Sequence, residues 1–117
     1  MAYNNLFSVM TYLHQEEFRV LYLNNQYHVL DKKCLSKGGI SETTVDIRLL
    51  FKNALRLGAI AIIVAHNHPS GVFTPSKSYM HLTKKNKKAG YNMDIKLLDH
   101  LIISEKGYFS FADENML

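Results

Sequence analysis

The sequence predicts a mixed α/β (α+β) domain in which a central sheet of about five or six strands packs against two or three helices. Short apolar runs rich in β-branched and aromatic residues alternate with longer segments whose apolar residues recur at helical spacing. The chain has 117 residues, which suits one domain with a buried core. Its hydrophobic fraction of 47% and charged fraction of 21% are ordinary for a globular protein.

The first part of the chain predicts one short helix followed by two or three strands. The apolar residues of this helix recur at i, i+3, i+4 and i+7, and they are Leu6, Val9, Met10 and Leu13. A strand rich in aromatic and β-branched residues covers Glu17–Leu23. A tight turn at Asn24-Asn25 follows, because asparagine tolerates positive φ better than most residues. Further strands fall at about Tyr27–Leu30 and near Lys33–Ser36.

A helix and a buried strand form the middle of the chain. Gly38-Gly39 interrupts the strand pattern, and Ser41 or Thr43 can then serve as the N-cap of the helix. Its apolar face consists of Ile47, Leu50, Phe51, Ala54 and Leu55. Gly58 stands just past the end of the helix, as is typical of a C-terminal stop. The unbroken apolar run Ala59–Ala65 follows and suits a strand covered on both faces.

The last part of the chain predicts a second long helix and two more strands. A loop over residues 66–75 holds both prolines. Ser76 then serves as the N-cap of a helix from about Lys77 to Ala89, which Gly90 ends. The final strands, joined by a turn over residues 105–107, are Ile95–Ser104, which is expected to be bent or bulged, and Tyr108–Phe111.

Several classes of protein do not fit this composition. The longest apolar stretch, Leu57–Ala65, is too short to span a bilayer, so no membrane association is expected. The first residues lack the basic region followed by an apolar one that a signal peptide requires. Cys34 is the only cysteine, so no internal disulfide can form, and a reducing cytoplasm is the expected location.

Two histidines at the end of the buried strand are the strongest chemical signal. His66 and His68 are spaced i, i+2, which puts both imidazoles on the same side of an extended chain. Pro69 holds His68 in an extended conformation, and Gly71 permits a sharp turn beside the pair. Two neutral imidazoles side by side make half of a tetrahedral zinc site.

Several segments resemble one known family. The runs AHNHPSG, TPS, LLDHLII and GYFSF, in this order and spacing, resemble the RadC family of JAB/MPN domains with the JAMM metalloprotease motif. The run GGISETTVDIRLLFKNALRLGA resembles that family's central helix region, and the likeness covers about Glu16 to Leu117. The resemblance implies a cytidine deaminase-like, three-layer arrangement with a mixed central sheet and flanking helices. It also implies one domain over residues 1–117 that lacks the N-terminal helical region common in the family.

The resemblance implies a hydrolase: a zinc metallopeptidase with one zinc ion, to which the family name attaches a role in DNA repair. His66 and His68 match the two histidine ligands, Ser76 matches the serine that stabilises the oxyanion, and Glu16 matches the general base. Zinc lowers the pKa of its bound water towards about 7, so that a carboxylate can take the proton. Glu17 competes with Glu16, because a slip of one residue on a strand reverses the face.

The chain departs from the motif at the third metal ligand. The family has an aspartate three residues after the serine, where this chain has Tyr79. A phenol binds metal only after losing a proton whose ordinary pKa is near 10, so we expect zinc binding to be weakened or lost. Tyr79 lies at roughly heptad spacing with Leu82, Asn86 and Ala89, which indicates that it packs against the core. Asp99 is the substitute ligand to consider.

A basic cluster and an unknown substrate leave the partners open. Much of the net charge of +4 lies in Lys84, Lys85, Lys87 and Lys88. These lysines can contact nucleic acid through its phosphates, although a solvated helix face explains them more simply. The leading hypothesis is therefore a metallopeptidase-like domain, weakened or inactive, that acts on an unidentified peptide or protein. The alternative is a non-catalytic binding module for a protein tail or nucleic acid.

Overall fold

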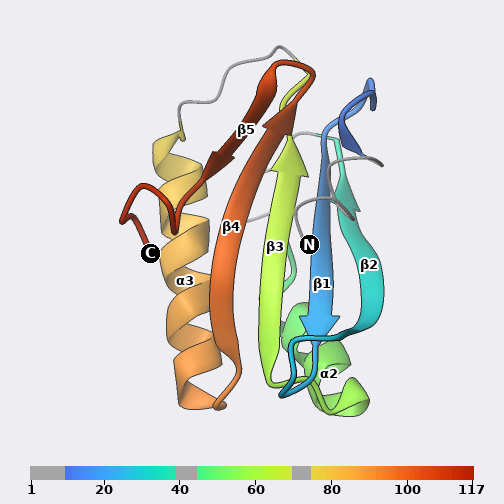
Figure 1. Ribbon diagram of the computed structural model, residues 1–117, viewed down its shortest axis with the longest axis vertical. Helices are drawn as coiled ribbons and strands as arrows, with labels where there is room; N and C mark the ends of the chain where they lie inside the picture. Colours follow the sequence, from blue (N-terminus) through green and yellow to red (C-terminus); the bar gives the residue numbers. More distant parts are fainter. Residues whose placement is uncertain (1–9, 39–44, 70–74) are drawn as a thin grey trace.

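A computed structural model of the chain (Figure 1) describes residues 10–38, 45–69 and 75–117. Five strands and two helices lie in these described ranges. They are β1 Glu17–Leu23, β2 Val29–Lys37, α2 Ile47–Leu57, β3 Ala61–Asn67, α3 Lys77–Asn92, β4 Lys96–Ser104 and β5 Gly107–Ser110. The order of the strands in the sheet is β2-β1-β3-β4-β5.

The sheet is mixed, as the sequence predicts. The neighbours β3 and β4 run parallel, and the other three pairs are antiparallel. A parallel pair needs a crossover connection, and α3 supplies it between β3 and β4 (Figure 1). The carboxyl ends of β3 and β4 therefore lie at the same edge of the sheet, next to the segment that leads into α3.

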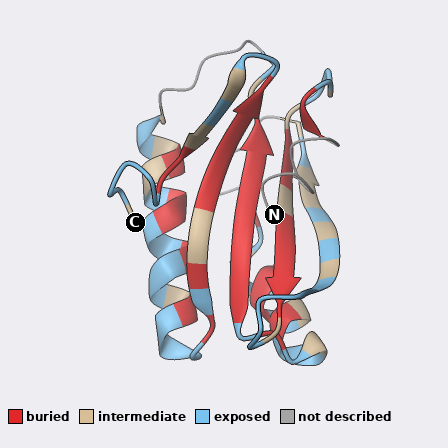
Figure 2. Cartoon of the chain, viewed as in Figure 1, coloured by how far each residue is buried: buried red, intermediate tan, exposed pale blue. Residues whose placement is uncertain are grey.

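Both helices contribute to one core on the same face of the sheet. There, Phe51 of α2 and Leu82 of α3 pack in one cluster with sheet residues such as Val64. The opposite face carries a second cluster, to which Met10 and Leu13 contribute. Figure 2 shows that the central strands are buried whereas β2 is largely exposed.

The third layer and the first helix are only partly described. Residues 6–9 of the predicted helix at Leu6–Leu13 lie outside the described residues, whereas Met10 is helical and Thr11 and Tyr12 form a turn. In the described part of the chain, neither helix combines the length and apolar character needed to cross a membrane.

Several element boundaries differ from the predicted ones. The expected strands at Tyr27–Leu30 and Lys33–Ser36 form one strand, β2, because its residues pair with β1 from Val29 to Lys37. Asp46 is the N-cap of α2, since its carboxylate accepts a hydrogen bond from the N–H of Leu49 at 3.2 Å.

Three further predictions concern the two caps of α2 and the residues on its buried face. Ser41 and Thr43, the expected caps, lie outside the described residues. Leu55 was expected on the buried face but is 62% exposed. The expectation for Gly58 is confirmed, because it ends α2 in the left-handed conformation with φ 70°.

The central strand β3 extends two residues further than predicted. The sequence predicts a strand over Ala59–Ala65, whereas β3 runs from Ala61 to Asn67. His66 pairs with Phe18 of β1 and with Ile102 of β4, so hydrogen bonding on both sides continues the strand. His66 therefore lies in a strand and not in the loop where it was expected.

Gly90 lies inside α3, so the expectation that it ends the helix is wrong. A Cβ atom at Gly90 would lie 2.1 Å from the carbonyl oxygen of Ile95. The carbonyl of Gly90 also accepts hydrogen bonds from the N–H groups of Met93 and Ile95, at 3.0 and 2.8 Å. Glycine is required here because the chain returns closely against the helix, not because the helix stops.

One buried side chain predicts a stabilising substitution. Asn86 of α3 is fully buried, and neither its amide nitrogen nor its oxygen has a hydrogen-bond partner among the described residues. Replacing an unsatisfied amide by an apolar group of similar size removes a desolvation cost. We expect Asn86→Leu to raise the free energy of unfolding by about 1–2 kcal/mol in urea denaturation. Asn92→Leu, at the exposed end of the same helix, is the control, and a loss of stability in Asn86→Leu would contradict the prediction.

Candidate active site

Both histidines of the predicted pair lie close to the aromatic ring of Tyr79. His66 is fully buried in β3, and half-buried His68 follows the strand. The N–H of His68 donates to the carbonyl of Ile103 at 2.7 Å, which carries the pairing with β4 past the end of β3. The ring of Tyr79 lies 3.9 Å from the ring of His66 and 6.1 Å from that of His68, measured between centroids.

Tyr79 joins the first turn of α3 to both the histidines and the predicted base. Ser76 is the N-cap of α3, as predicted, and its hydroxyl accepts a hydrogen bond from the N–H of Tyr79 at 3.1 Å. The phenol of Tyr79 donates to Oε1 of Glu16 at 3.0 Å. Burial, together with the hydrogen bond to Glu16 and its charge, raises the pKa of Tyr79 well above 10. The phenol is therefore protonated at neutral pH, and the structure has Tyr79 buried against the core.

Glu16 and Glu17 face different neighbours. The carboxylate of Glu17 accepts hydrogen bonds from Arg19 at 2.7 and 2.9 Å and from the thiol of Cys34 at 3.5 Å. Burial would raise the pKa of Glu17, but the hydrogen bonds and charge of Arg19 bring that pKa below its ordinary value. Glu16 alone of the two contacts Tyr79, so it is the glutamate at the histidine side of the sheet.

Asn67, between the two histidines, holds the residues around Glu16 in place. Its side-chain oxygen accepts a hydrogen bond from the N–H of Glu17 at 2.7 Å, and its side-chain amide donates to the carbonyl of Gln15 at 3.0 Å. Sequence reasoning did not single out this residue. Its position within the His-Asn-His run is the signal that could have found it.

A second buried histidine, His100 of β4, is hydrogen-bonded to the ring of His66. Nδ1 of His66 lies 2.9 Å from Nε2 of His100, whose ring stacks on Phe111 at 4.7 Å between centroids. Nδ1 of His100 contacts the hydroxyl of Thr83, which donates in turn to the carbonyl of Tyr79 at 2.9 Å. Sequence reasoning noted His100 only as the neighbour of Asp99.

The directions of the hydrogen bonds that link Thr83, His100 and His66 determine which ring nitrogen of His66 carries the proton. Because the Thr83 hydroxyl gives its proton to a carbonyl, its oxygen accepts the proton of Nδ1 of His100. Nε2 of His100 then accepts from Nδ1 of His66. Nε2 of His66 is left as a bare lone pair, buried and without a hydrogen-bond partner among the described residues.

The electrostatics of the two rings agree with this order. Burial, with the nearby charges of His100 and His68, lowers the pKa of His66 well below 6.5. Burial alone lowers the pKa of His100 to about 3. Both imidazoles are therefore neutral near pH 7, and each carries one proton.

The carboxylate of Asp99 is bound by residues at and after the end of β5 and by the backbone of His100. One extra residue in β4, between Leu97 and Asp99, brings His100 to the helix side, where it pairs with Val64. The carboxylate of Asp99 accepts hydrogen bonds from its neighbour's N–H at 2.7 Å, from the N–H of Ala112 at 3.0 Å and from the hydroxyl of Ser110. Asp99 therefore organises the turn after β5. The expectation of a bulge in this strand is confirmed.

The described side chains at this edge differ in how well they suit a metal ligand. The lone pair on Nε2 of His66 suits a metal ligand, since a zinc-bound imidazole must be unprotonated at the binding nitrogen. The phenol of Tyr79 does not suit one, because it is protonated and donates to Glu16. In the ranges that the structure describes, no three histidine, cysteine, aspartate or glutamate side chains are grouped to hold a metal.

Fold and site together define a class. A mixed sheet with a crossover helix after its central strand, and a His-x-His run at the carboxyl end of that strand, is the arrangement of a JAB-type domain. A family model described as a RadC-like JAB domain matches residues 1–116, and the chain belongs to this family.

Several relatives of the chain carry the name UPF0758. This chain is 54% identical over 104 residues to a UPF0758 protein of Flavobacterium johnsoniae. The matched segment covers 89% of this chain and 45% of that relative. This chain is 47% identical over 118 residues to one of Porphyromonas gingivalis, covering 100% and 52%. It is 44% identical over 108 residues to UPF0758 protein YeeS of Escherichia coli, covering 92% and 73%. The chain thus spans about half the length of the first two.

The contacts of Asn67 predict a loss of stability on its removal. Asn67→Ala leaves the buried N–H of Glu17 without its acceptor. We expect the free energy of unfolding to fall by about 1–3 kcal/mol, with faster hydrogen exchange at the amide of Glu17. Both are measurable, by denaturation and by NMR. Unchanged exchange at Glu17 would show that Asn67 does not hold this segment.

The surroundings of Cys34 predict that its thiol is alkylated slowly and that Glu17→Gln increases the rate of alkylation. Burial, the charge of Glu17 and a hydrogen bond to it raise the pKa of Cys34 above 9.0. Little thiolate is present at neutral pH, so alkylation should be slow. Glu17→Gln removes the negative charge and lowers the pKa, so alkylation by iodoacetamide should be faster at pH 8. The matched variant Glu16→Gln should leave the rate unchanged, and equal acceleration in both would contradict the assignment of the two glutamates.

Proposed function

We propose that this chain is a zinc-metallopeptidase-like JAB domain of the JAMM type in which hydrolysis is lost or severely reduced, and that it acts as a non-catalytic binding module. The observation that carries the proposal is the double contact of Tyr79. The centroid of its ring lies 3.9 Å from that of His66, and its hydroxyl donates a hydrogen bond to the carboxylate of Glu16. The side chain of Tyr79 thus contacts both a proposed metal ligand, His66, and the proposed base, Glu16.

The chemistry of hydrolysis explains why this contact is inhibitory. A zinc site of this kind needs three protein ligands and a water, together with a carboxylate free to take the proton of that water. Tyr79 supplies a protonated phenol in place of the third ligand, and it fills the space beside Glu16 with a ring. Zinc is therefore expected to bind weakly or not at all.

Substrate, location and wider role belong to the proposal. We place the protein in the cytoplasm because its only cysteine, Cys34, makes no disulfide. The DNA-repair role that the family name suggests would require nucleic-acid contact, and the lysines of α3 are the residues that could make it. Peptide recognition without cleavage is the competing role, in which the remaining half-buried imidazole of His68 would contact the peptide.

Restoring the acid at residue 79 tests the proposal. We expect Tyr79→Asp to bind a full equivalent of zinc, because it supplies the third ligand, frees Glu16 and allows a capping box with Ser76. The unaltered chain should bind much less than one equivalent. Metal content after dialysis against buffered zinc, with a fluorogenic peptide library as the activity assay, measures both.

Two further variants make the result interpretable. Tyr79→Phe frees Glu16 but adds no ligand, so it should not recover zinc. Tyr79→Asp combined with His66→Ala should lose the recovered zinc if His66 is a ligand. Stoichiometric zinc and peptidase activity in the unaltered chain would overturn the proposal, and absence of zinc from Tyr79→Asp would show that the site has changed beyond residue 79.

A further inference from the structure

A second surface feature lies at the opposite end of α3 from Tyr79. There, a depression with a volume of about 410 Å³ opens between the last turns of α3 and the start of β4. This volume is within the roughly 300–1,000 Å³ range of ligand sites. Its walls include the buried residues Gly90 and Leu97, the exposed residue Asp94, and three larger side chains, those of Lys87, Tyr91 and Lys96. The residues that line this depression include neither the histidine pair nor Glu16, Ser76 or Tyr79.

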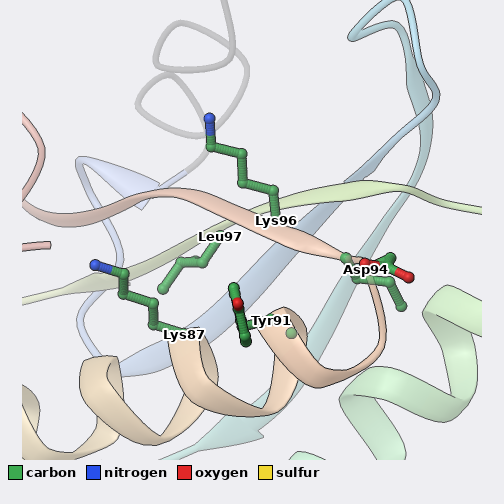
Figure 3. A pocket seen from close by; sticks show the side chains of 7 residues that line it. Lys87, Tyr91, Asp94, Lys96 and Leu97 are labelled. Atoms are coloured by element: carbon green, nitrogen blue, oxygen red, sulfur yellow. The ribbon is translucent and has the colours of Figure 1, made fainter.

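The side chains at the depression combine an aromatic ring with two cations. Figure 3 shows Leu97 between the side chains of Lys87 and Lys96, with Tyr91 beside them on α3. Tyr91 is 83% exposed, so its ring contributes almost nothing to the core. Asp94 is the one acidic residue that lines the depression, and it stands at the far end from the two lysines (Figure 3).

The positive charge continues along the helix away from the depression. Lys84, Lys87, Lys88 and Tyr91 are spaced three or four residues apart, which puts them on one side of α3. This row covers about 10 Å at 1.5 Å per residue. The 16 residues of α3 include five lysines, Lys77 among them, and no aspartate or glutamate. The lysines of the row are all exposed.

We propose that this surface, formed by Tyr91, Lys87, Lys96 and the lysine row of α3, binds single-stranded nucleic acid. A base would stack on the exposed ring of Tyr91 over the apolar floor at Leu97, and the phosphates on either side would contact the lysines. Surfaces that bind single strands without sequence preference combine stacking rings with a positively charged track in this way. A strand is favoured over a free nucleotide, because the charge extends well beyond the depression.

The surface is independent of the histidine site, and so is its test. The probe is a fluorescently labelled ten-nucleotide oligothymidylate, followed by anisotropy with the 117-residue chain at several salt concentrations. We expect binding that weakens as salt rises. Tyr91→Ala should weaken it roughly tenfold, because base stacking is lost. Lys87→Ala with Lys96→Ala should reduce the slope of log K against log salt by about 1.4, because each phosphate contact on a single strand contributes about 0.7.

Matched controls separate this surface from general charge effects. Tyr12 is 74% exposed on another part of the chain, so Tyr12→Ala should leave binding unchanged. Exposed Lys32 and Lys52 lie on β2 and α2, and their double alanine variant removes the same charge from elsewhere. It should keep the affinity within about twofold if the α3 surface is the site.

Three outcomes would overturn the proposal. One is absence of binding at low salt. Another is equal weakening by the control and the test variants, which would indicate unspecific attraction to a basic protein. The third is tighter binding of duplex DNA of the same length, or of thymidine monophosphate alone, since neither result fits a stacked single strand.

Discussion

The parallel pairing of β3 with β4 is the constraint on which the rest of the molecule depends. It requires a crossover, and the crossover is α3. Because α3 starts near the carboxyl end of β3, its first turn brings Tyr79 against His66. The same pairing, shifted by one residue in β4, brings His100 beneath His66. Thus one strand pair assembles the histidines, the tyrosine and their support.

Among the described residues, hydrogen bonds and ring contacts link the side chains at this edge of the sheet. Asn67 fixes the start of β1 on one side of β3, and Thr83 and His100 fix His66 on the other. Tyr79 closes the space between Glu16 and His66. Under the proposed function, Tyr79 stands at the position of a third metal ligand and links the proposed ligand His66 to the proposed base Glu16.

Local signals predicted much of this arrangement. The caps at Ser76 and Gly58 depend on short-range backbone geometry and were correct. Predictions that depended on a partner element were less accurate. The length of β3 depends on pairing with two neighbours, and the role of Gly90 depends on the return of the chain at Ile95. Neither contact leaves a mark in the pattern of apolar residues.

The sequence by itself determined the class of fold, the family and the position of the histidine pair, because periodicity, caps and the His-x-His run are properties of neighbouring residues. Only the tertiary structure decided which glutamate faces Tyr79, because a strand start can turn either way until Asn67 and Arg19 hold it. It also decided that His100 faces the histidines and Asp99 the turn after β5, since one extra residue in β4 reverses the facing of every side chain beyond it.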